Sequence, residues 1–160
     1  MGTRIDYFND PAAPPANSIR PSAAALVVRG STVLLTQRSD NGNWSMPGGA
    51  HDPGESLSQT AIRETREETG IEIRLLGAVG IFTDPRHVVH YTSDDEVRQE
   101  FTIVYRAEYL DGTPTPSQET SRVEWIDRDQ ITDLPMDRSQ RMRIEWGLTQ
   151  SGTWIDPSGD

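Results

Sequence analysis

Residues 49–71 read GAHDPGESLSQTAIRETREETGI, and this stretch decides most of what the sequence indicates about its fold. A Pro-Gly dipeptide near its start is typical of a turn, and Ser56 followed by Gln59 forms a capping box that opens a helix. Gly70 stands where a C-cap would end that helix. The stretch therefore predicts a loop, a helix over residues 57–69 and a second loop.

Three glutamates of the predicted helix share one face. At roughly 100° per residue, Glu64, Glu67 and Glu68 fall within about 100° of one another. Like-charge pairs at these spacings cost roughly a few tenths of a kcal/mol each, so the face favours a bound cation. Oxygen ligands favour a hard ion, Mg²⁺ or Mn²⁺. The alternative is a solvated acidic face that pairs with Arg63 and Arg66.

Composition limits the classes of function. The chain has 160 residues with a formal net charge of −10, and its length predicts one domain with a sizeable core. The negative charge argues against binding long nucleic acid, whereas a small phosphorylated substrate that carries its own metal is compatible. All 15 basic residues are arginine, which excludes lysine-dependent P-loops and Schiff bases.

The termini differ in composition from the middle of the chain. No apolar run approaches about 18 residues and no hydrophobic signal core is visible, so we expect a cytoplasmic protein that does not enter membranes. Proline-rich residues 1–21 predict an extended or partly ordered arm, in which Tyr7 and Phe8 are candidates to cover a partner subunit or a substrate base. Residues 22–148 form the predicted domain, and residues 149–160 form a tail.

Short apolar runs and one helical pattern organise that domain. They predict strands over residues 23–28, 32–36, 72–82, 97–109 and 123–126, and a final helix over residues 138–148. A polar loop over residues 83–96 is expected to carry specificity. On the strand that follows it, Glu100 projects opposite the face that holds Phe101 and Tyr105. These elements indicate an α+β layered fold with a mixed sheet.

Without lysine, arginine has to hold any substrate phosphate, through its planar fork of donors. Four arginines lie in or beside predicted loops and strand ends: Arg29, Arg38, Arg86 and Arg98. Of these, we take Arg38 and Arg86 as candidates to bind substrate. Phe82 and Tyr91 flank the polar loop and are candidates to stack on a purine base.

The fixed glycines, arginine and glutamates of residues 49–71 together resemble the Nudix box. The matching positions are Gly49, Glu55, Arg63, Glu64, Glu67, Glu68 and Gly70. The chain is thus similar to the Nudix hydrolases, and the resemblance implies an α/β/α sandwich in which the box forms a loop-helix-loop motif. Thr65 stands where the box prefers an aliphatic residue, but its methyl group can still pack.

The resemblance also implies roles for the box residues. It assigns metal binding to Glu64, Glu67 and Glu68, with the backbone carbonyl of Gly49 as a further ligand. It assigns structural roles to Glu55, Arg63 and Gly70, the first two as an ion pair that ties the box together.

The implied reaction is attack of water on one phosphorus of a pyrophosphate linkage, assisted by Mg²⁺ or Mn²⁺. A general base must reach that water. Glu64 is the first candidate; Glu100 is expected to act as a further metal ligand or as the base, and Glu96 is the rival in the loop. His87 and His90 are interpreted as exposed or hydrogen-bonded side chains rather than as catalytic residues.

The favoured substrate is a nucleoside diphosphate linked to another group, with ADP-ribose or a related nucleotide sugar first. Members of the family that act on ADP-ribose often carry a proline about fifteen residues beyond the box, and Pro85 follows Gly70 by 15 positions. The alternative is an ordinary or oxidised nucleoside triphosphate, and RNA decapping ranks below both. An alternative of another class is a nucleotide-sensing domain without turnover. The resemblance implies a homodimer.

Overall fold

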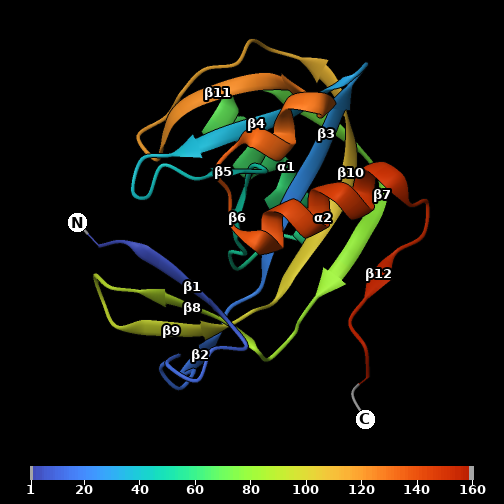
Figure 1. The fold of residues 1–160 in the computed structure, drawn as a ribbon. Coiled ribbons are helices and arrows are strands. Elements are labelled where there is room, and N and C mark those ends of the chain that lie inside the picture. Colours follow the sequence, from blue (N-terminus) through green and yellow to red (C-terminus); the bar gives the residue numbers. More distant parts are fainter. Residues whose placement is uncertain (1, 159–160) are drawn as a thin grey trace.

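Two β-sheets and two helices make up the computed structural model, which describes residues 2–158 (Figure 1). The strands are β1 (Arg4–Phe8), β2 (Ser18–Ile19), β3 (Ser22–Arg29), β4 (Thr32–Arg38), β5 (Trp44–Ser45), β6 (Gly48–Ala50), β7 (Glu72–Phe82), β8 (His87–Tyr91), β9 (Glu96–Gln99), β10 (Thr102–Asp111), β11 (Thr120–Asp127) and β12 (Trp154–Ile155). The helices are α1 (Leu57–Thr69) and α2 (Arg138–Thr149), and a 3₁₀ helix, η1, covers Arg128–Asp133. This combination confirms the expected α+β class.

The larger sheet is mixed. Its strand order is β11-β4-β3-β10-β7-β12, with β5 paired to β4 and β6 paired to β3. β3 runs parallel to β10 and antiparallel to both β4 and β6. The predicted hairpin between β3 and β4 is present, and Gly30 at its tip has a φ of 60°, which glycine adopts without strain.

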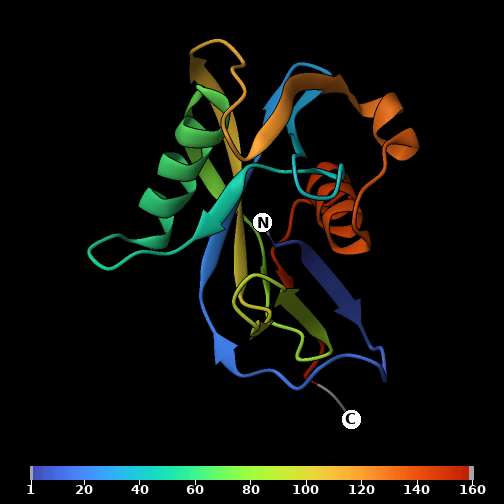
Figure 2. The ribbon, with the colours of Figure 1, turned by 90° about the vertical axis from the view of Figure 1, so that its left-hand side faces the viewer.

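The helices cover opposite faces of this sheet, as the ribbon turned by 90° shows (Figure 2). Alternating residues of β3 pack on opposite faces of the sheet. Ala24 and Leu26 belong to the hydrophobic cluster that contains Ile144 of α2. Ala25 and Val27 belong to the other cluster, against which Ile62 of α1 packs. Burial on both faces explains the almost continuous apolar run of β3 and produces the α/β/α layers.

Local signals fix the limits of α1. The Ser56 hydroxyl accepts a hydrogen bond from the Gln59 amide at 3.1 Å, and the Gln59 side chain accepts one from the Ser56 amide at 2.7 Å. Gly70 ends the helix in the left-handed conformation, with a φ of 74°. The buried face consists of Thr60, Ala61, Thr65 and Thr69. The helix predicted over residues 57–69 is therefore confirmed, and Thr65 packs in the core.

The second sheet, which we call the small sheet, has the order β1-β8-β9-β2 and lies below the larger sheet in Figure 1. The prediction of one polar loop over residues 83–96 is wrong, because β8 and the start of β9 form an antiparallel hairpin there. Val88, Val89 and Val97 are buried in this hairpin. The predicted strand 97–109 is likewise two strands, β9 and β10, separated at Glu100 and Phe101.

Both terminal segments contribute strands that their composition did not predict. In the arm, β1 pairs antiparallel with β8, and β2 pairs parallel with β9. In the tail, β12 runs parallel to β7. The first residue of the arm and the last two of the tail lie outside the described residues. Within residues 2–158, no helix is long and apolar enough to cross a membrane.

Candidate active site

The box helix meets β6 at Gly49. A Cβ atom built on Gly49 would lie 2.5 Å from the carboxyl carbon of Glu64, so only a residue without a side chain admits this approach. β6 is held in place by its pairing with β3, which opposes Gly49 to Ala23. The Glu64 carboxylate therefore packs directly against the backbone of the glycine loop.

Arg63 joins the loop to the helix. Its Nη1 lies 2.9 Å from an oxygen of Glu64 and 3.1 Å from an oxygen of Glu67. Its Nη2 donates to the Ala50 carbonyl and to Glu55, while its Nε also donates to Glu55. Hydrogen bonds from Arg63 and Thr60 lower the pKa of Glu55 to about 2. This geometry agrees with the structural interpretation of Glu55 and Arg63.

Burial raises the pKa values of two other carboxylates of the box helix, Glu64 and Glu68. Burial raises the pKa of Glu68 well above its ordinary value, and the neighbouring charges of Glu64 and Glu119 raise it further. Burial also raises the pKa of Glu64; Arg63 opposes the shift, but Glu67 and Glu119 reinforce it. Removing charged carboxylates from water is costly unless a cation compensates them. The site therefore favours either protons or a bound cation.

Glu119 is a fourth carboxylate of this site that the sequence did not indicate. It precedes β11, 51 positions after Glu68, and it lines the same cleft as Glu68. Thr120 next to it donates a hydrogen bond to the Glu68 carbonyl at 3.2 Å. The predicted strand over residues 123–126 begins four residues after Glu119, so its only sequence signal is its place in a loop, where site residues are common.

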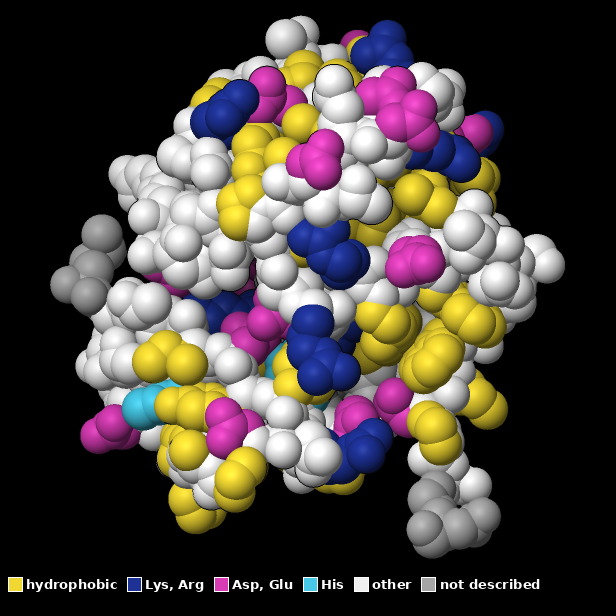
Figure 3. Space-filling model, in the orientation of Figure 1, with side chains coloured by type: hydrophobic (Ala, Val, Ile, Leu, Met, Phe, Trp, Pro, Cys, Tyr) yellow, Lys and Arg dark blue, Asp and Glu magenta, His cyan; other side chains and the backbone are white. Residues whose placement is uncertain are grey.

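A cleft of about 140 Å³ lies between the larger sheet, the start of α2 and the small sheet. Its lining includes Arg4, Asp6, Arg20, Arg38, Gly48, Gly49, Glu68, Tyr91, Arg98, Glu100, Glu119, Gln140 and Arg143. On the face drawn in Figure 3, basic and acidic side chains meet in the hollow between the larger sheet and the small sheet below it. The structure thus brings together the predicted residues Gly49, Glu68, Glu100, Arg38 and Tyr91.

Two substrate-binding candidates, Phe82 and Arg86, do not line this cleft. Phe82 is buried in the core, stacked on Trp154 at 6.3 Å, with the Arg143 guanidinium 4.6 Å from its ring centre. It therefore has no open ring face for a purine. Arg86 is exposed, pairs with Asp84 at 2.9 Å, and lines a separate cavity together with Phe82.

Glu100 is fixed in a buried ionic chain. Its Oε2 lies 3.0 Å from Arg143 and 3.2 Å from Nδ1 of His87, and its Oε1 accepts a hydrogen bond from Thr102 at 2.6 Å. Burial raises the pKa of Glu100, but Arg143 and His87 outweigh that effect and lower it overall. The predicted roles of Glu100 as metal ligand or base would require release from these partners.

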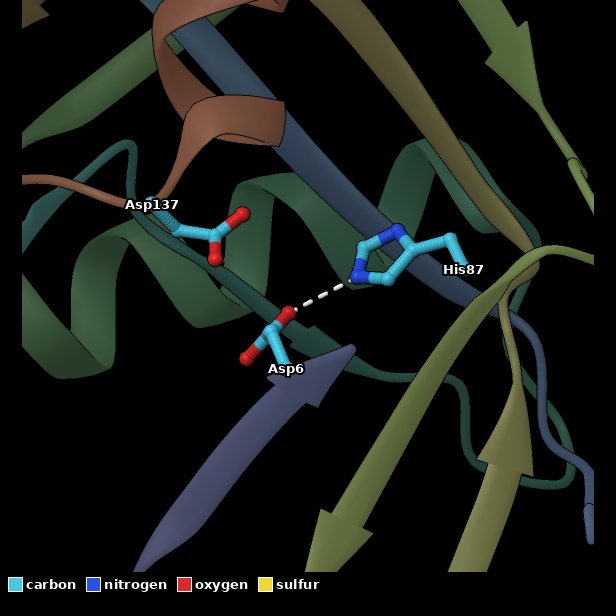
Figure 4. Close-up of side chains that lie close together, drawn as sticks. All are labelled: Asp6, His87 and Asp137. Carbon is cyan, nitrogen blue, oxygen red and sulfur yellow. Dashed lines mark hydrogen bonds and ion pairs between the residues drawn. The ribbon is translucent and has the colours of Figure 1, made fainter. Parts of the chain in front are cut away.

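The same chain continues through His87 to the N-terminal strand. Nε2 of His87 lies 2.8 Å from Asp6 (Figure 4). Asp6 also forms a bidentate ion pair with Arg4. Asp137, the N-cap of α2, lies beside them and accepts hydrogen bonds from Ser139. The three residues drawn in Figure 4 are a potential oxygen and nitrogen donor set, but these contacts already occupy Asp6 and Asp137. We interpret this series of ionic contacts as the connection between the small sheet and α2.

The other loop residues considered from the sequence also have protein partners. Glu96 pairs with Arg98 at 2.7 Å and does not line the cleft. His90 lies 3.3 Å from Asp95. The structure therefore favours Glu64 and Glu119 over Glu96 as carboxylates near the box.

Gly49→Ala is expected to reduce hydrolytic activity by about ten- to a hundredfold while changing the melting temperature little. The new methyl group would displace only the flexible end of Glu64, so the fold tolerates it but the carboxylate loses its position. Kinetics and thermal melting of the same preparation check both parts. The matched control is Gly152→Ala, where a Cβ meets no atom within 4 Å. Wild-type activity in Gly49→Ala would show that this contact does not matter.

Comparisons with known proteins agree with the family that the box indicates and with the fold. A family model described as the NUDIX domain matches residues 18–146. A Bacillus subtilis protein named as an uncharacterized Nudix hydrolase, YvcI, is 35% identical over 104 residues, which cover 65% of this chain and 63% of the relative. A putative 8-oxo-dGTP diphosphatase of the same organism is 34% identical over 95 residues, 59% of this chain and 56% of the relative.

Solved structures agree on the fold. An ADP-ribose pyrophosphatase from Streptococcus suis superposes with a TM-score of 0.66 at 20% identity, covering 85% of this chain and 98% of that chain. At this level of identity the likeness shows the fold alone. Because the family model covers most of the sequence, the chain belongs to the Nudix hydrolase family.

Proposed function

We propose that this enzyme is a Mg²⁺-dependent pyrophosphohydrolase that cleaves the diphosphate of a nucleoside diphosphate linked to another group, ADP-ribose or a related nucleotide sugar first. The observation that carries the proposal is the crowding of Glu64, Glu68 and Glu119 beside a cleft whose other walls hold arginines. Pro85, 15 positions after Gly70, supports the nucleotide-sugar choice.

The residues present fit a divalent metal ion. The carboxylates of Glu64, Glu67 and Glu68 and the backbone of Gly49 offer only oxygen ligands, which suit Mg²⁺ and also Mn²⁺. The raised pKa values of Glu64 and Glu68 mark negative charge that a cation would stabilise. When bound, the metal would supply charge neutralisation at the phosphate oxygens and a more acidic water.

The chain's own groups would do the remaining work. Arg38, which lines the cleft and is partly held by Asp40 at 2.8 Å, is placed to bind a substrate phosphate. Glu64 remains our choice of general base, because its half-buried carboxylate has a raised pKa and lies at the box loop. Tyr91 lines the opposite wall and offers an aromatic surface for the substrate.

The second candidate is hydrolysis of an oxidised or ordinary nucleoside triphosphate, supported by the name of one B. subtilis relative. A nucleotide-sensing domain without turnover is the third, and the complete set of box carboxylates speaks against it. From the family resemblance we also propose a cytoplasmic homodimer. Light scattering should then give roughly twice the chain mass of 17.8 kDa, and a monomer mass would refute the dimer.

The choice of substrate is tested by a hydrolysis panel with Mg²⁺. It should contain ADP-ribose, other nucleoside diphosphate sugars, dinucleotide polyphosphates, and ordinary and oxidised triphosphates. The proposal expects ADP-ribose or a related sugar to give the highest kcat/KM, with a nucleoside monophosphate and a sugar phosphate as products. A nucleoside monophosphate and pyrophosphate from a triphosphate would instead establish the second candidate. No turnover, together with a melting temperature that nucleotides raise, would favour the sensing domain.

A further inference from the structure

The small sheet presents three arginines to the cleft, on the side away from the box helix. Arg4 lies on β1, Arg98 lies on β9, and Arg20 lies between β2 and β3. We call these three residues the arginine wall. Arg98 is one of the four arginines that the sequence places in or beside loops and strand ends, whereas Arg4 and Arg20 lie in the N-terminal arm, whose strands the sequence does not predict.

Strand register places two members of the wall, Arg4 and Arg98, on one face of the small sheet. Arg4 is paired with Tyr91 on β8, and Arg98 is paired with Val89, two residues before Tyr91. Residues paired across strands, and residues two apart along a strand, point to the same side of a sheet. The Arg98 guanidinium lies over the Tyr91 ring, 4.5 Å from the ring centre, in a cation–π contact. The two guanidinium groups therefore face the cleft together.

Arg4 and Arg98 are more buried than ordinary surface arginines, whereas Arg20 is exposed. The side chains of Arg98, Arg4 and Arg20 are 17%, 22% and 45% exposed, whereas that of Arg74 on β7 is 65% exposed. Arg4 and Arg98 also repel each other, since each is within range of the other's charge. Crowding two half-buried cations at a cleft wall is unfavourable unless anions offset them.

The protein's own carboxylates offset the charge only in part on the cleft side. Arg4 pairs with Asp6 at 2.7 Å, and Asp6 lines the cleft. The partners of Arg98 and Arg20, which are Glu96 and Asp52, do not line it. Three arginines therefore line the cleft at this wall, and of their own carboxylate partners only Asp6 lines it with them.

The position of the wall is rigidly defined. The ionic chain Asp6–His87–Glu100–Arg143 connects β1 and β8 to α2 through contacts of 2.8, 3.2 and 3.0 Å. All of these side chains are almost fully buried. These ionic contacts hold the small sheet, and with it the arginine wall, in a fixed position relative to the box carboxylates.

We propose that the arginine wall is an anion subsite, which binds a phosphate group of the substrate independently of the metal ion. This inference rests on the proposed function and adds to it, because it divides the site into an acidic half that binds metal and a basic half that binds phosphate. The phosphate has two sources with the same chemistry: the diphosphate itself, or a further terminal phosphate. Arginine suits either one, through paired hydrogen bonds to phosphate oxygens.

The test is calorimetric binding of ADP, ADP-ribose and ATP to the full chain in EDTA, where the box cannot contribute a metal. The wild type and Glu68→Gln are expected to bind, whereas Arg98→Ala is expected to bind about ten- to a hundredfold more weakly. The matched control, Arg74→Ala, removes an arginine that pairs with Glu108 outside the cleft and should bind like the wild type. Equal melting temperatures of Arg98→Ala and the wild type would exclude misfolding as the cause of the weaker binding. Arg98→Lys serves as a milder variant in the same comparison.

The ligands distinguish the two sources of phosphate. Weaker binding of all three to Arg98→Ala assigns the subsite to the diphosphate, and weaker binding of ATP alone assigns it to a terminal phosphate. Wild-type affinity in both Arg98→Ala and Arg4→Ala, or no binding by the wild type in EDTA, would overturn the subsite. Because this assay needs no turnover, it is independent of the hydrolysis panel. If nucleotide binding depends on Arg98 but no substrate is hydrolysed, the proposed function is refuted while the anion subsite is still supported.

Discussion

Glu68→Gln is expected to reduce metal-dependent hydrolysis by on the order of a thousandfold without lowering the melting temperature. Glutamine keeps the shape of the side chain but removes the charge that a divalent ion requires. The fold should not suffer, because burial and the charges of Glu64 and Glu119 already disfavour the ionised form of Glu68. Steady-state kinetics at saturating Mg²⁺, paired with a thermal melt, measure both parts of this expectation.

Glu145→Gln is the matched control, since Glu145 is exposed on α2 and does not line the cleft. It should keep wild-type kinetics. A Glu68→Gln enzyme with wild-type kcat would contradict the assignment of this carboxylate to the metal-binding face. The same substitution at Glu64, Glu100 and Glu119 separates their roles, since the general base should lose turnover while keeping substrate affinity.

Asp6→Asn is expected to lower the free energy of unfolding by about 3–5 kcal/mol, because it removes one member of a buried ionic chain. The carboxylate of Asp6 lies 2.7 Å from Arg4 and 2.8 Å from His87, and its side chain is almost fully buried. Asparagine has the same shape but leaves the charge of Arg4 without its partner. Urea denaturation at neutral pH measures the loss.

The pH dependence gives this prediction a definite sign. Burial by itself raises the pKa of Asp6, but hydrogen bonds from His87 and Arg4 outweigh it and hold the pKa well below the ordinary 3.8. A pKa that folding lowers contributes stability that is fully present above the unfolded value of 3.8 and is lost as the pH falls below it. The difference between wild type and Asp6→Asn should therefore shrink below about pH 4.

The control for this variant is Asp133→Asn, at an exposed position at the end of η1, which should unfold like the wild type. Equal stability of Asp6→Asn and the wild type at neutral pH would show that the ionic chain does not hold β1. A difference that grows toward acid would refute the stated direction of the pKa shift. Either result would also weaken the argument that the small sheet is fixed against α2.

Local signals explain which parts of the fold could be predicted. The helix over residues 57–69 was placed correctly because Ser56, Gln59 and Gly70 act within one turn of its ends. The hairpin of β3 and β4 was visible because two apolar runs flank a glycine turn. In both cases the residues that fix the element are neighbours in the sequence.

The small sheet could not be predicted, because distant partners stabilise it. β1 pairs with β8, with 79 to 87 positions between paired residues, and in its alternating sequence the side chain of the polar Asp6 is almost fully buried whereas the apolar Ile5 is exposed. Without this sheet, the contacts of Asp6 with His87 and of Glu100 with Arg143 were invisible. The box carboxylates could be chosen from one helix face, whereas Glu119 joins them only through the pairing of β11 with β4.

The most direct test of the account is the rate of nucleoside monophosphate formation from the best substrate of the panel, measured with wild-type enzyme over a Mg²⁺ titration that starts in EDTA. The account predicts no product in EDTA, a rate that saturates with Mg²⁺, and no comparable rise in Glu68→Gln. Equal product formation with and without a divalent ion, or an equal Mg²⁺ response in Glu68→Gln, would contradict a metal-dependent reaction at the carboxylates of the box helix.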